Sequence, residues 1–313
     1  MSSAIQSRQS RTRVKSTASL AHRLAERGID ARLWLLAPAL VFIVALFVYP
    51  FAYGIGLTFQ PLARTTEQWG GGPFANYVEF FKDPFTFESV WLTMKLALPA
   101  ALFNVIVSIP LAFKLRHRFR GKRFLSTLLV LPITLGTVLT AQGLLIFAGR
   151  QGWLNRFLLD THIIDQPLQL VNNYLGVMFS LIISGFPFAF LLVSSYLSGI
   201  DPSIEAAART LGANWRQRFR RVTLPLLAPG LATTFILTFV LAFSVFPSAR
   251  LVGDPGGDTR VMALMAYRAF GEQQNYSMAS TIAIMMGVIE LVVIAFVLLG
   301  RSFFYKGSTG GKG

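Results

Sequence analysis

Residues that could carry enzyme chemistry are few in this sequence, and they lie far apart. The chain has no cysteine, and its three histidines stand in separate segments without the spacing of metal ligands. Neither a Gly-x-Ser-x-Gly nucleophile motif nor a His-Glu-x-x-His motif is present. The C-terminal run 307–313 contains glycines and a lysine but lacks the spacing of a phosphate-binding loop. We therefore expect no catalytic residue, no metal site, no cofactor and no ATP binding by this chain alone.

The segment 205–225 carries chemistry of another kind, that of a helical surface which can bind a protein. Asp201 is a candidate N-cap, and Pro202 suits the first position of a helix. Glu205 stands in the first turn, where the helix dipole favours a carboxylate. These signals predict a short helix that runs through three alanines to Leu211.

Gly212 is expected to end this first helix or to bend the chain sharply. A second short helix is predicted from Trp215 to Val222, with Phe219 on the same apolar face and arginines around it. We expect the Leu224-Pro225 pair to end this second helix and to lead into an apolar stretch. The predicted shape is a stiff helix-glycine-helix protrusion.

A protrusion with a smooth alanine surface and an apolar patch rimmed by arginines suits docking into a groove on a soluble partner. The simpler interpretation is that the loop merely carries the positive charge of a cytoplasmic loop and lies along the lipid headgroups. That interpretation explains the arginines but neither the alanine run nor Gly212. We therefore favour docking.

The composition is that of a membrane protein, since 53% of the 313 residues are hydrophobic and only 14% are charged. A bilayer core takes about 20 helical residues to cross. Without the alternation of barrel strands, long apolar runs predict helices. The six predicted spans are approximately 33–59, 90–113, 124–148, 174–198, 227–249 and 278–304.

The distribution of basic residues predicts the orientation. Lysines and arginines number 21 in the tails and loops on the side of both termini, against seven in the loops opposite. The positive-inside rule therefore places both termini in the cytoplasm. Residues 1–32 are expected to form a basic N-terminal tail and residues 305–313 a flexible C-terminal one. The formal net charge of +15 follows from topology, and we expect no nucleic-acid partner.

Two ionisable residues fall inside predicted spans. Glu290 lies near the middle of the sixth span, where it is expected to face the helical bundle or to be protonated. A functional role and a structural hydrogen bond to a neighbouring helix are both open for it. Lys95 lies in the first turns of its span, and its long side chain can reach the interface, so a structural role is the favoured interpretation.

The segment 205–225 resembles the EAA loop of permease subunits of binding-protein-dependent ABC importers. The pattern is Glu-Ala-Ala, a glycine after three further residues, and then Leu-Pro. The matching positions here are Ala207, Ala208, Leu211, Gly212, Ala213, Leu224 and Pro225. Counted back from Gly212, the family's glutamate falls at Ala206, while Glu205 stands one place earlier. Either Glu205 supplies the carboxylate from the neighbouring position, or the coupling contact is weaker or is made differently.

The resemblance implies the type I ABC importer permease fold, all-α with six spans, over residues 33–304. It implies that the loop 200–225 forms a coupling helix in a groove of a cytoplasmic ATP-hydrolysing subunit, through Glu205, Ala206, Ala207, Ala208, Leu211, Gly212, Ala213, Leu224 and Pro225. It further implies a second permease, identical or different, and a periplasmic solute-binding protein. The location implied is the bacterial inner membrane, and the mechanism is alternating access driven by the ATPase.

The solute is less sharply indicated. Residues 244–260 and 276–280 look like the corresponding parts of the spermidine/putrescine-type branch, which also contains permeases for other small solutes. The resemblance thus points to a polyamine-like or other small organic solute. Residues that could line its path, or could equally serve packing, are Phe243, Ser244, Phe246, Ser248 and Glu290.

Two other classes of protein remain open at this point. A stand-alone secondary transporter would need intramembrane ionisable groups for ion coupling, and Glu290 and Lys95 are the candidates. An integral membrane enzyme would need a catalytic cluster, which the sequence does not offer. A bulky residue in place of Gly212 is expected to abolish transport by an ABC permease while leaving the chain in the membrane.

Overall fold

The computed structural model describes residues 32–116 and 121–304, and these residues form helices and loops without strands. The predicted tails therefore lie almost wholly outside the described residues. The helices are, in chain order, α2 (Arg32–Ile43), the π turn η1 (Val44–Val48), α3 (Tyr49–Thr58), α4 (Ala63–Trp69), the 3₁₀ turn η2 (Gly72–Phe74), α5 (Ala75–Lys82), α6 (Pro84–Arg116), α7 (Lys122–Ala148), α8 (Trp153–Asp160), α9 (Tyr174–Ser198), α10 (Pro202–Thr210), α11 (Trp215–Arg218), the π turn η3 (Phe219–Thr223), α12 (Leu224–Phe243), α13 (Pro247–Leu251), α14 (Met262–Tyr267), the π turn η4 (Arg268–Glu272) and α15 (Tyr276–Phe304).

Six helical stretches among the described residues are long and apolar enough to cross a membrane, which confirms the predicted number of spans. Five of them follow the predicted ranges closely. The fifth differs, because α12 ends at Phe243 and a new short helix, α13, begins only at Pro247. The predicted continuous span 227–249 is therefore wrong at residues 244–246, where the chain leaves the helix.

Two π turns are each followed closely by a proline. In η1 the N–H of Tyr49 donates to the carbonyl of Val44, one residue before Pro50. In η3 the N–H of Leu224 donates to the carbonyl of Phe219, one residue before Pro225. A proline has no N–H to give to the carbonyl four residues back, and the wider turn accommodates this loss without ending the helix. The expectation that Leu224-Pro225 ends a helix is therefore wrong, since the helix continues into α12.

The chain divides into two compact units, residues 1–54 and residues 55–313. The described part of the first unit is a helical run of α2, η1 and the start of α3, in which the rings of Tyr49 and Tyr53 stack at 6.4 Å.

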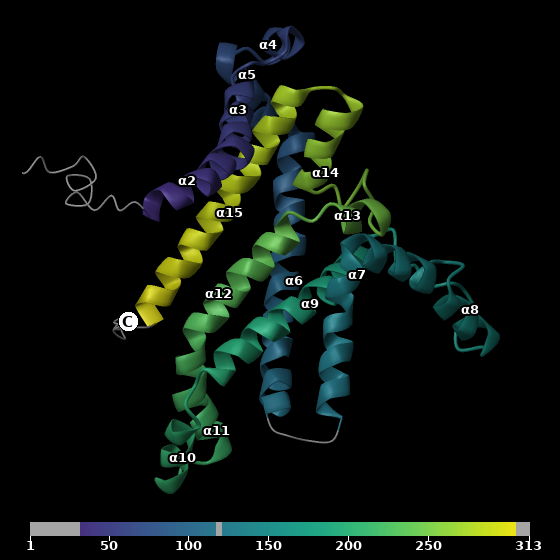
Figure 1. The fold of residues 1–313 in the computed structure, drawn as a ribbon. Helices are drawn as coiled ribbons and strands as arrows, with labels where there is room; N and C mark the ends of the chain where they lie inside the picture. The colour runs from purple at the N-terminus through teal and green to yellow at the C-terminus, as the bar shows by residue number, and fades with distance from the viewer. Residues whose placement is uncertain (1–31, 117–120, 305–313) are drawn as a thin grey trace, which may run out of the picture. The chain divides into compact units, whose positions relative to one another are not determined.

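The second unit is built on α6, α9 and α12, which pack against one another (Figure 1). Small residues on α6 let the neighbouring helices approach closely, a common solution where lipid gives no hydrophobic drive for helix association. The large side chains that fill the same core come mainly from α9, α12 and α14, with Phe80 of α5, Leu96 of α6 and Ile282 of α15. Fully buried members of this core include Phe80, Leu96, Ala97, Ala100, Ala101, Val177, Phe239, Phe243, Met262, Leu264 and Ile282.

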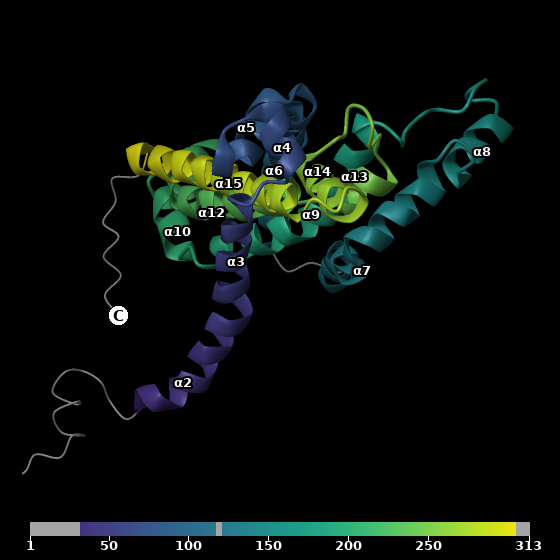
Figure 2. The same ribbon diagram turned by 90° about the horizontal axis from the view of Figure 1, so that it is seen from above.

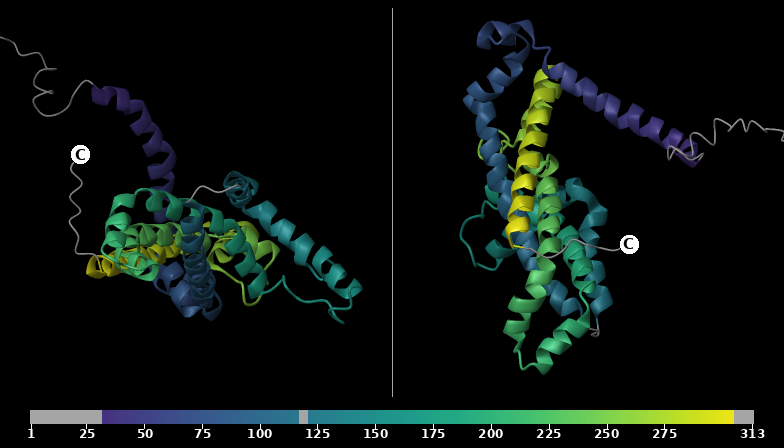
Figure 3. Two further views of the ribbon diagram at one scale, coloured as in Figure 1. Left: turned by 90° about the horizontal axis from the view of Figure 1, so that it is seen from below. Right: turned by 90° about the vertical axis from the view of Figure 1, so that its left-hand side faces the viewer.

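Elements of the second unit gather at two opposite ends of these packed helices. Figure 1 and the right-hand view of Figure 3 show α10 and α11 at one end, and α4, α5 and α14 at the other. We call these the loop end and the far end. Helix α7 is interrupted at Gly136, whose φ of 71° and ψ of 170° are not helical, and Figures 1 and 2 show its two halves running in different directions.

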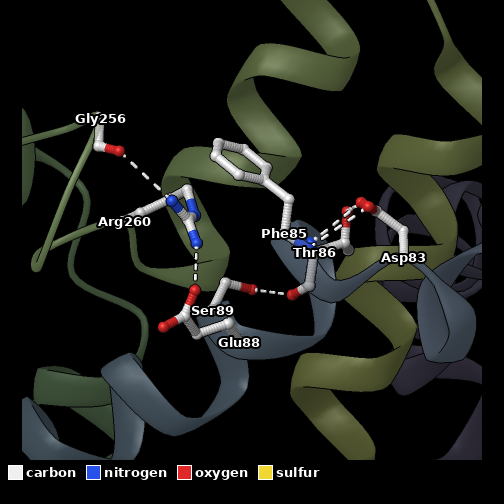
Figure 4. A network of polar contacts seen from close by, with 7 residues as sticks. All are labelled: Asp83, Phe85, Thr86, Glu88, Ser89, Gly256 and Arg260. Carbon is white, nitrogen blue, oxygen red and sulfur yellow. Dashed lines mark hydrogen bonds and ion pairs between the residues drawn. The ribbon is translucent and has the colours of Figure 1, made fainter.

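At the far end, Arg260 joins the loop before α14 to the start of α6 (Figure 4). Its Nη2 lies 2.7 Å from Oε2 of Glu88, and its Nη1 donates to the carbonyl of Gly256 at 3.3 Å. The guanidinium carbon lies 3.5 Å from the ring centroid of Phe85. Asp83 begins α6 as a cap, since its carboxylate accepts the N–H of Thr86 at 3.0 Å. The far-end loop is thus fastened to a capped helix start.

Candidate functional site

Helix α10 forms where the sequence predicts a helix. Oδ1 of Asp201 accepts the N–H of Ser203 at 2.8 Å, and Pro202 occupies the first turn. This backbone hydrogen bond, with a further hydrogen bond to the Ser203 side chain, lowers the pKa of Asp201 below its ordinary value.

Gly212 ends α10 in the left-handed region, with φ of 81°. Its N–H donates to the carbonyl of Arg209 at 3.0 Å, and the N–H of Ala213 donates to the carbonyl of Ala208 at 3.1 Å. This pair of hydrogen bonds is the Schellman motif, in which glycine is favoured because a Cβ at positive φ is strained. The predicted role of Gly212 as a C-cap is therefore confirmed.

The second half of the loop begins with a capping box. The side chain of Asn214 accepts the N–H of Gln217, and the side chain of Gln217 accepts the N–H of Asn214, both at 2.9 Å. The apolar face that follows lies against α6, since the ring of Phe219 meets Phe113 edge-on at 5.2 Å. Trp215 stacks on Phe219 at 5.8 Å. This aromatic face thus attaches the loop to a span.

The outward surface of the loop is formed by α10. Ile204, Ala207 and Leu211, at spacings of three and four residues, are all exposed, and Leu211 is 88% exposed. An apolar side chain presented this fully at the tip of a capped turn is typical of a protein contact. Of the other expected coupling residues, Ala206, Gly212 and Pro225 are also exposed, whereas Glu205, Ala208, Ala213 and Leu224 are half-buried.

Glu205 points toward the spans and not toward the outward surface. Its Oε1 lies 2.7 Å from Nη1 of Arg116, the last residue of α6, and accepts the hydroxyl of Thr223 at 3.2 Å. Nη2 of Arg116 donates to the carbonyl of Ile200 at 3.1 Å. Sequence reasoning did not identify Arg116 or Thr223 as partners of Glu205, because the only local signals are the positive charge of Arg116 and the position of Thr223 before Leu224-Pro225.

The five candidate path residues are distributed over four places. Phe243 is fully buried in the core, and Ser248 is buried with its hydroxyl 2.8 Å from that of Ser180. The ring of Phe246 lies 4.8 Å from that of Tyr267. Ser244 and Glu290 are brought together, since the serine hydroxyl donates to Oε1 of the carboxylate at 2.7 Å, directly at the break after α12.

Sequence reasoning missed a small cavity among α6, α7, α9 and α12, whose lining is mostly apolar. The cavity has a volume of about 110 Å³, and its polar lining residues are Asn104, Thr137, Ser184 and Thr238. Hydroxyls of Ser184 and Thr238 donate to carbonyls of their own helices and keep lone pairs free. No single-residue signal marks this cavity, because each helix contributes one ordinary polar side chain.

Asn104 is the most informative of these residues because it is only 2% exposed. Its Nδ2 donates to the carbonyl of Leu181 at 3.3 Å, which fixes the orientation of the amide. Its Oδ1 has no hydrogen-bond partner among the described residues. A buried acceptor without a donor is costly, so this cavity suits a group that donates hydrogen bonds.

The chain matches the family model described as binding-protein-dependent transport system inner membrane component over residues 104–304. It is 33% identical over 226 residues to the probable sulfate transport system permease protein cysT of Prototheca wickerhamii, covering 72% of this chain and 86% of that protein. It is 29% identical over 222 residues to the spermidine/putrescine transport system permease protein PotB of Haemophilus influenzae, covering 70% and 76%.

Solved structures agree on the fold. A chain of a bacterial alginate ABC transporter, in complex with a periplasmic protein bound to an alginate pentasaccharide, superposes with a TM-score of 0.75 at 20% identity, covering 92% of this chain and 99% of that one. A chain of the MetNI methionine ABC transporter gives 0.54 at 16% identity, covering 71% and 97%.

The family match spans well over half of the chain and contains the loop, the cavity and the last four spans. It decides against the stand-alone secondary transporter and the membrane enzyme as alternatives, because ATP hydrolysis in such importers occurs on separate subunits. The chain belongs to the family of binding-protein-dependent transport system inner membrane components, and it is a multi-pass inner-membrane permease subunit of an ABC importer with the type I fold.

Proposed function

We propose that α10 is the coupling helix of this permease and that it docks, with Leu211 at its tip, into a groove of a cytoplasmic ATP-hydrolysing subunit. The observation that carries the proposal is the 88% exposure of Leu211 on a doubly capped loop. Such a tip is rigid, so little conformational entropy is lost when a partner binds it. This placement puts the loop end and both termini in the cytoplasm, in agreement with the bias of basic residues.

The test is co-purification of the ATPase subunit from membranes of cells that express the whole transport system. Leu211→Glu places a charge on the apolar tip and is expected to reduce the recovered ATPase at least about tenfold, because a buried charge without a partner is costly. Leu211→Met keeps the size and the apolar character and is the matched control. Full recovery of the ATPase with Leu211→Glu would contradict docking through this tip.

The remaining partners follow from the same assignment. A second permease, the same chain or a different one, completes the solute path, and a periplasmic binding protein delivers solute to the far end. Closure of the ATPase subunits draws the two coupling helices together, and the permeases rock between inward-open and outward-open states. The fastened far-end loop of Arg260 supplies a firm surface on the side that receives solute.

For the solute we propose an amine-bearing, polyamine-like small molecule. The cavity at Asn104 presents acceptor oxygens from four helices, which suits a group that donates hydrogen bonds, such as an ammonium. The carboxylate of Glu290 adds negative charge beside the C-terminal end of α12, where the helix dipole also favours a cation. The similarity to a permease named for spermidine and putrescine supports this choice.

A sulfate-like oxyanion is the second candidate. Lys95 is exposed on α6 within a span, with its Nζ 5.5 Å from the ring centroid of Trp91, and it could attract an anion. Relatives named as sulfate permeases support this alternative.

Uptake of labelled spermidine and of labelled sulfate by cells with the whole system separates the two candidates. The amine assignment predicts spermidine uptake that falls at least about tenfold with Glu290→Gln and changes little with Lys95→Gln. Sulfate uptake that depends on Lys95 and not on Glu290 would replace the amine with the oxyanion. Glutamine is isosteric with glutamate and removes its charge, and at position 95 it removes the charge of lysine while keeping a polar side chain, so the comparison tests the two charges.

A further inference from the structure

We propose that Glu205 is a positioning residue, which fastens the coupling helix to the ends of three spans and makes no docking contact with the ATPase. The proposal rests on the proposed function of α10 and assigns a different task to the carboxylate that stands one place before the family's glutamate position. Three facts carry it: the inward direction of the side chain, the identity of its partners, and the place of those partners in the chain.

The carboxylate joins segments that are far apart in sequence. Arg116 ends α6, the second span, and Thr223 is the last residue before α12, the fifth span. Both contact the same oxygen, Oε1 of Glu205. Arg116 also donates to the carbonyl of Ile200, two residues beyond the end of α9, the fourth span. One ion pair therefore connects α10 with three spans.

Arginine is suited to this position in a way that lysine is not. Its planar guanidinium presents separate N–H groups to the carboxylate and to the Ile200 carbonyl at once, whereas a lysine ammonium is a single point charge. The pair is partly withdrawn from water, since the side chains of Arg116 and Glu205 are 18% and 26% exposed. Salt screens such a pair less than it screens a fully exposed one.

The ion pair and the outward surface lie on different sides of α10. Leu211, Ala207 and Ile204 are exposed, while Glu205 is half-buried beside Arg116. The other attachment, Phe219 on Phe113, is apolar and reaches α6 alone. A movement of α10 reaches the spans only if the contacts that attach α10 to them are firm, because coupling requires elements that move together. Loss of the ion pair should therefore leave docking intact and weaken the transmission of movement.

The first measurement reports only on the attachment of α10 to the spans, and it needs neither the ATPase nor the solute. The chain has no cysteine, so Ala207→Cys gives a single site for a nitroxide label on the exposed side of α10, away from Glu205. In purified protein, Glu205→Ala is expected to sharpen the electron paramagnetic resonance spectrum of this label, which reports a more mobile helix. Glu205→Gln still accepts from both donors and is expected to give an intermediate spectrum. An unchanged spectrum in Glu205→Ala would overturn the proposal.

The second measurement reports on coupling in the whole transport system. Glu205→Ala and Thr223→Val are expected to retain the co-purifying ATPase within about twofold while uptake per ATP hydrolysed falls, by about tenfold for Glu205→Ala and less for Thr223→Val. The labelled solute is spermidine or sulfate, whichever the unaltered system takes up. Thr210→Ala removes a hydroxyl that bonds only within α10, and it is the matched control.

The outcomes separate the two proposals. Loss of the ATPase with Glu205→Ala, while the label spectrum stays unchanged, would make Glu205 a docking residue and overturn its positioning role. Retention of the ATPase with Leu211→Glu would instead overturn docking through α10, whatever the spectrum shows. If the label reports a mobile α10 in Glu205→Ala but uptake per ATP hydrolysed stays at the unaltered level, the positioning role in coupling is also refuted.

Discussion

The two ends of α12 are constructed in opposite ways. At its start the helix is continuous with a loop whose caps lie within a few residues of the groups they serve: Asp201 with Ser203, Asn214 with Gln217, and Gly212 with the last turn of α10. At its other end the helix stops, and distant residues hold the irregular chain, since Ser244 contacts Glu290 and Ser248 contacts Ser180.

This difference matches what the two ends have to do. A coupling element must keep its shape while a partner pushes on it, and local capping with a left-handed glycine provides that stiffness. Irregular backbone within a membrane is tolerated where protein buries it or where it borders a polar path. The break after Phe243 therefore lies where adjustable contacts are useful.

Replacement of Gly212 should have the largest effect, because it changes the shape of the stiff end. A Cβ at this position meets no atom within 4 Å, so the cost comes only from the positive φ of 81°. A β-branched residue in this conformation costs about 1–2 kcal/mol, enough to favour another loop geometry. Gly212→Val is expected to abolish uptake while the chain stays in the membrane, as measured by immunoblot of membrane fractions.

Asparagine tolerates the left-handed region better than other residues with a Cβ, so Gly212→Asn is the matched variant and should retain most uptake. If both variants are equally active, the stiffness of the loop end is not needed for coupling. If both variants are equally inactive, Gly212 is needed because any side chain there keeps the ATPase subunit from approaching closely, and the left-handed backbone conformation is not the cause.

The next prediction concerns the adjustable region of the spans. A Cβ at Gly185 would lie 2.6 Å from Nδ2 of Asn104, so Gly185→Ala must displace the amide from the carbonyl of Leu181. We expect spermidine uptake to fall by about tenfold, the size of a lost specific polar contact, while the ATPase still co-purifies. Gly287→Ala in α15 is the control, since a Cβ there meets nothing within 4 Å. Equal uptake by the two variants would remove Asn104 from the solute path.

The loop end could be predicted from the sequence because its determinants are local. The N-cap, the helix start at Pro202 and the turn at Gly212 were all expected from their order along the chain. The orientation of Glu205 could not be predicted, because Arg116 lies 89 residues away and only the folded chain brings them together.

The far and middle regions were predicted less well for the same reason. Hydropathy predicts the six spans, but it treats residues 227–249 as one apolar run. It therefore cannot detect the break between α12 and α13, where Ser244 contacts Glu290. The cavity at Asn104 depends on one polar residue from each of four helices. No spacing along one helix contains that arrangement, so periodicity could not find it.

A smaller effect is expected from the far-end ion pair, which extends the comparison to stability. Arg260→Met removes the contacts with Glu88 and the Gly256 carbonyl, and hydrogen bonds to a charged group contribute about 2 kcal/mol. We expect a lower thermal midpoint of the detergent-solubilised chain. Arg250→Met is the control, because its pair with Glu272 is at 4.0 Å and well exposed. Equal midpoints would show that Arg260 does not stabilise the far end.

The smallest expected effect is the response of the α10 cap to acid. Hydrogen bonds from Ser203 lower the pKa of Asp201 below that of a free aspartate, so the charged cap stabilises the helix at every pH above the ordinary value. That contribution declines as pH falls below the ordinary value and is gone once pH has passed through the lowered pKa. Hydrogen exchange at the first turn of α10, compared with Asp201→Asn, measures it, since asparagine caps a helix without titrating. The charged cap should protect the turn more at neutral pH, and the advantage should vanish in acid. If the advantage is the same at every pH, then the stiffness of the loop end comes from the Gly212 turn and the Asn214 box, and the carboxylate at 201 adds nothing to it.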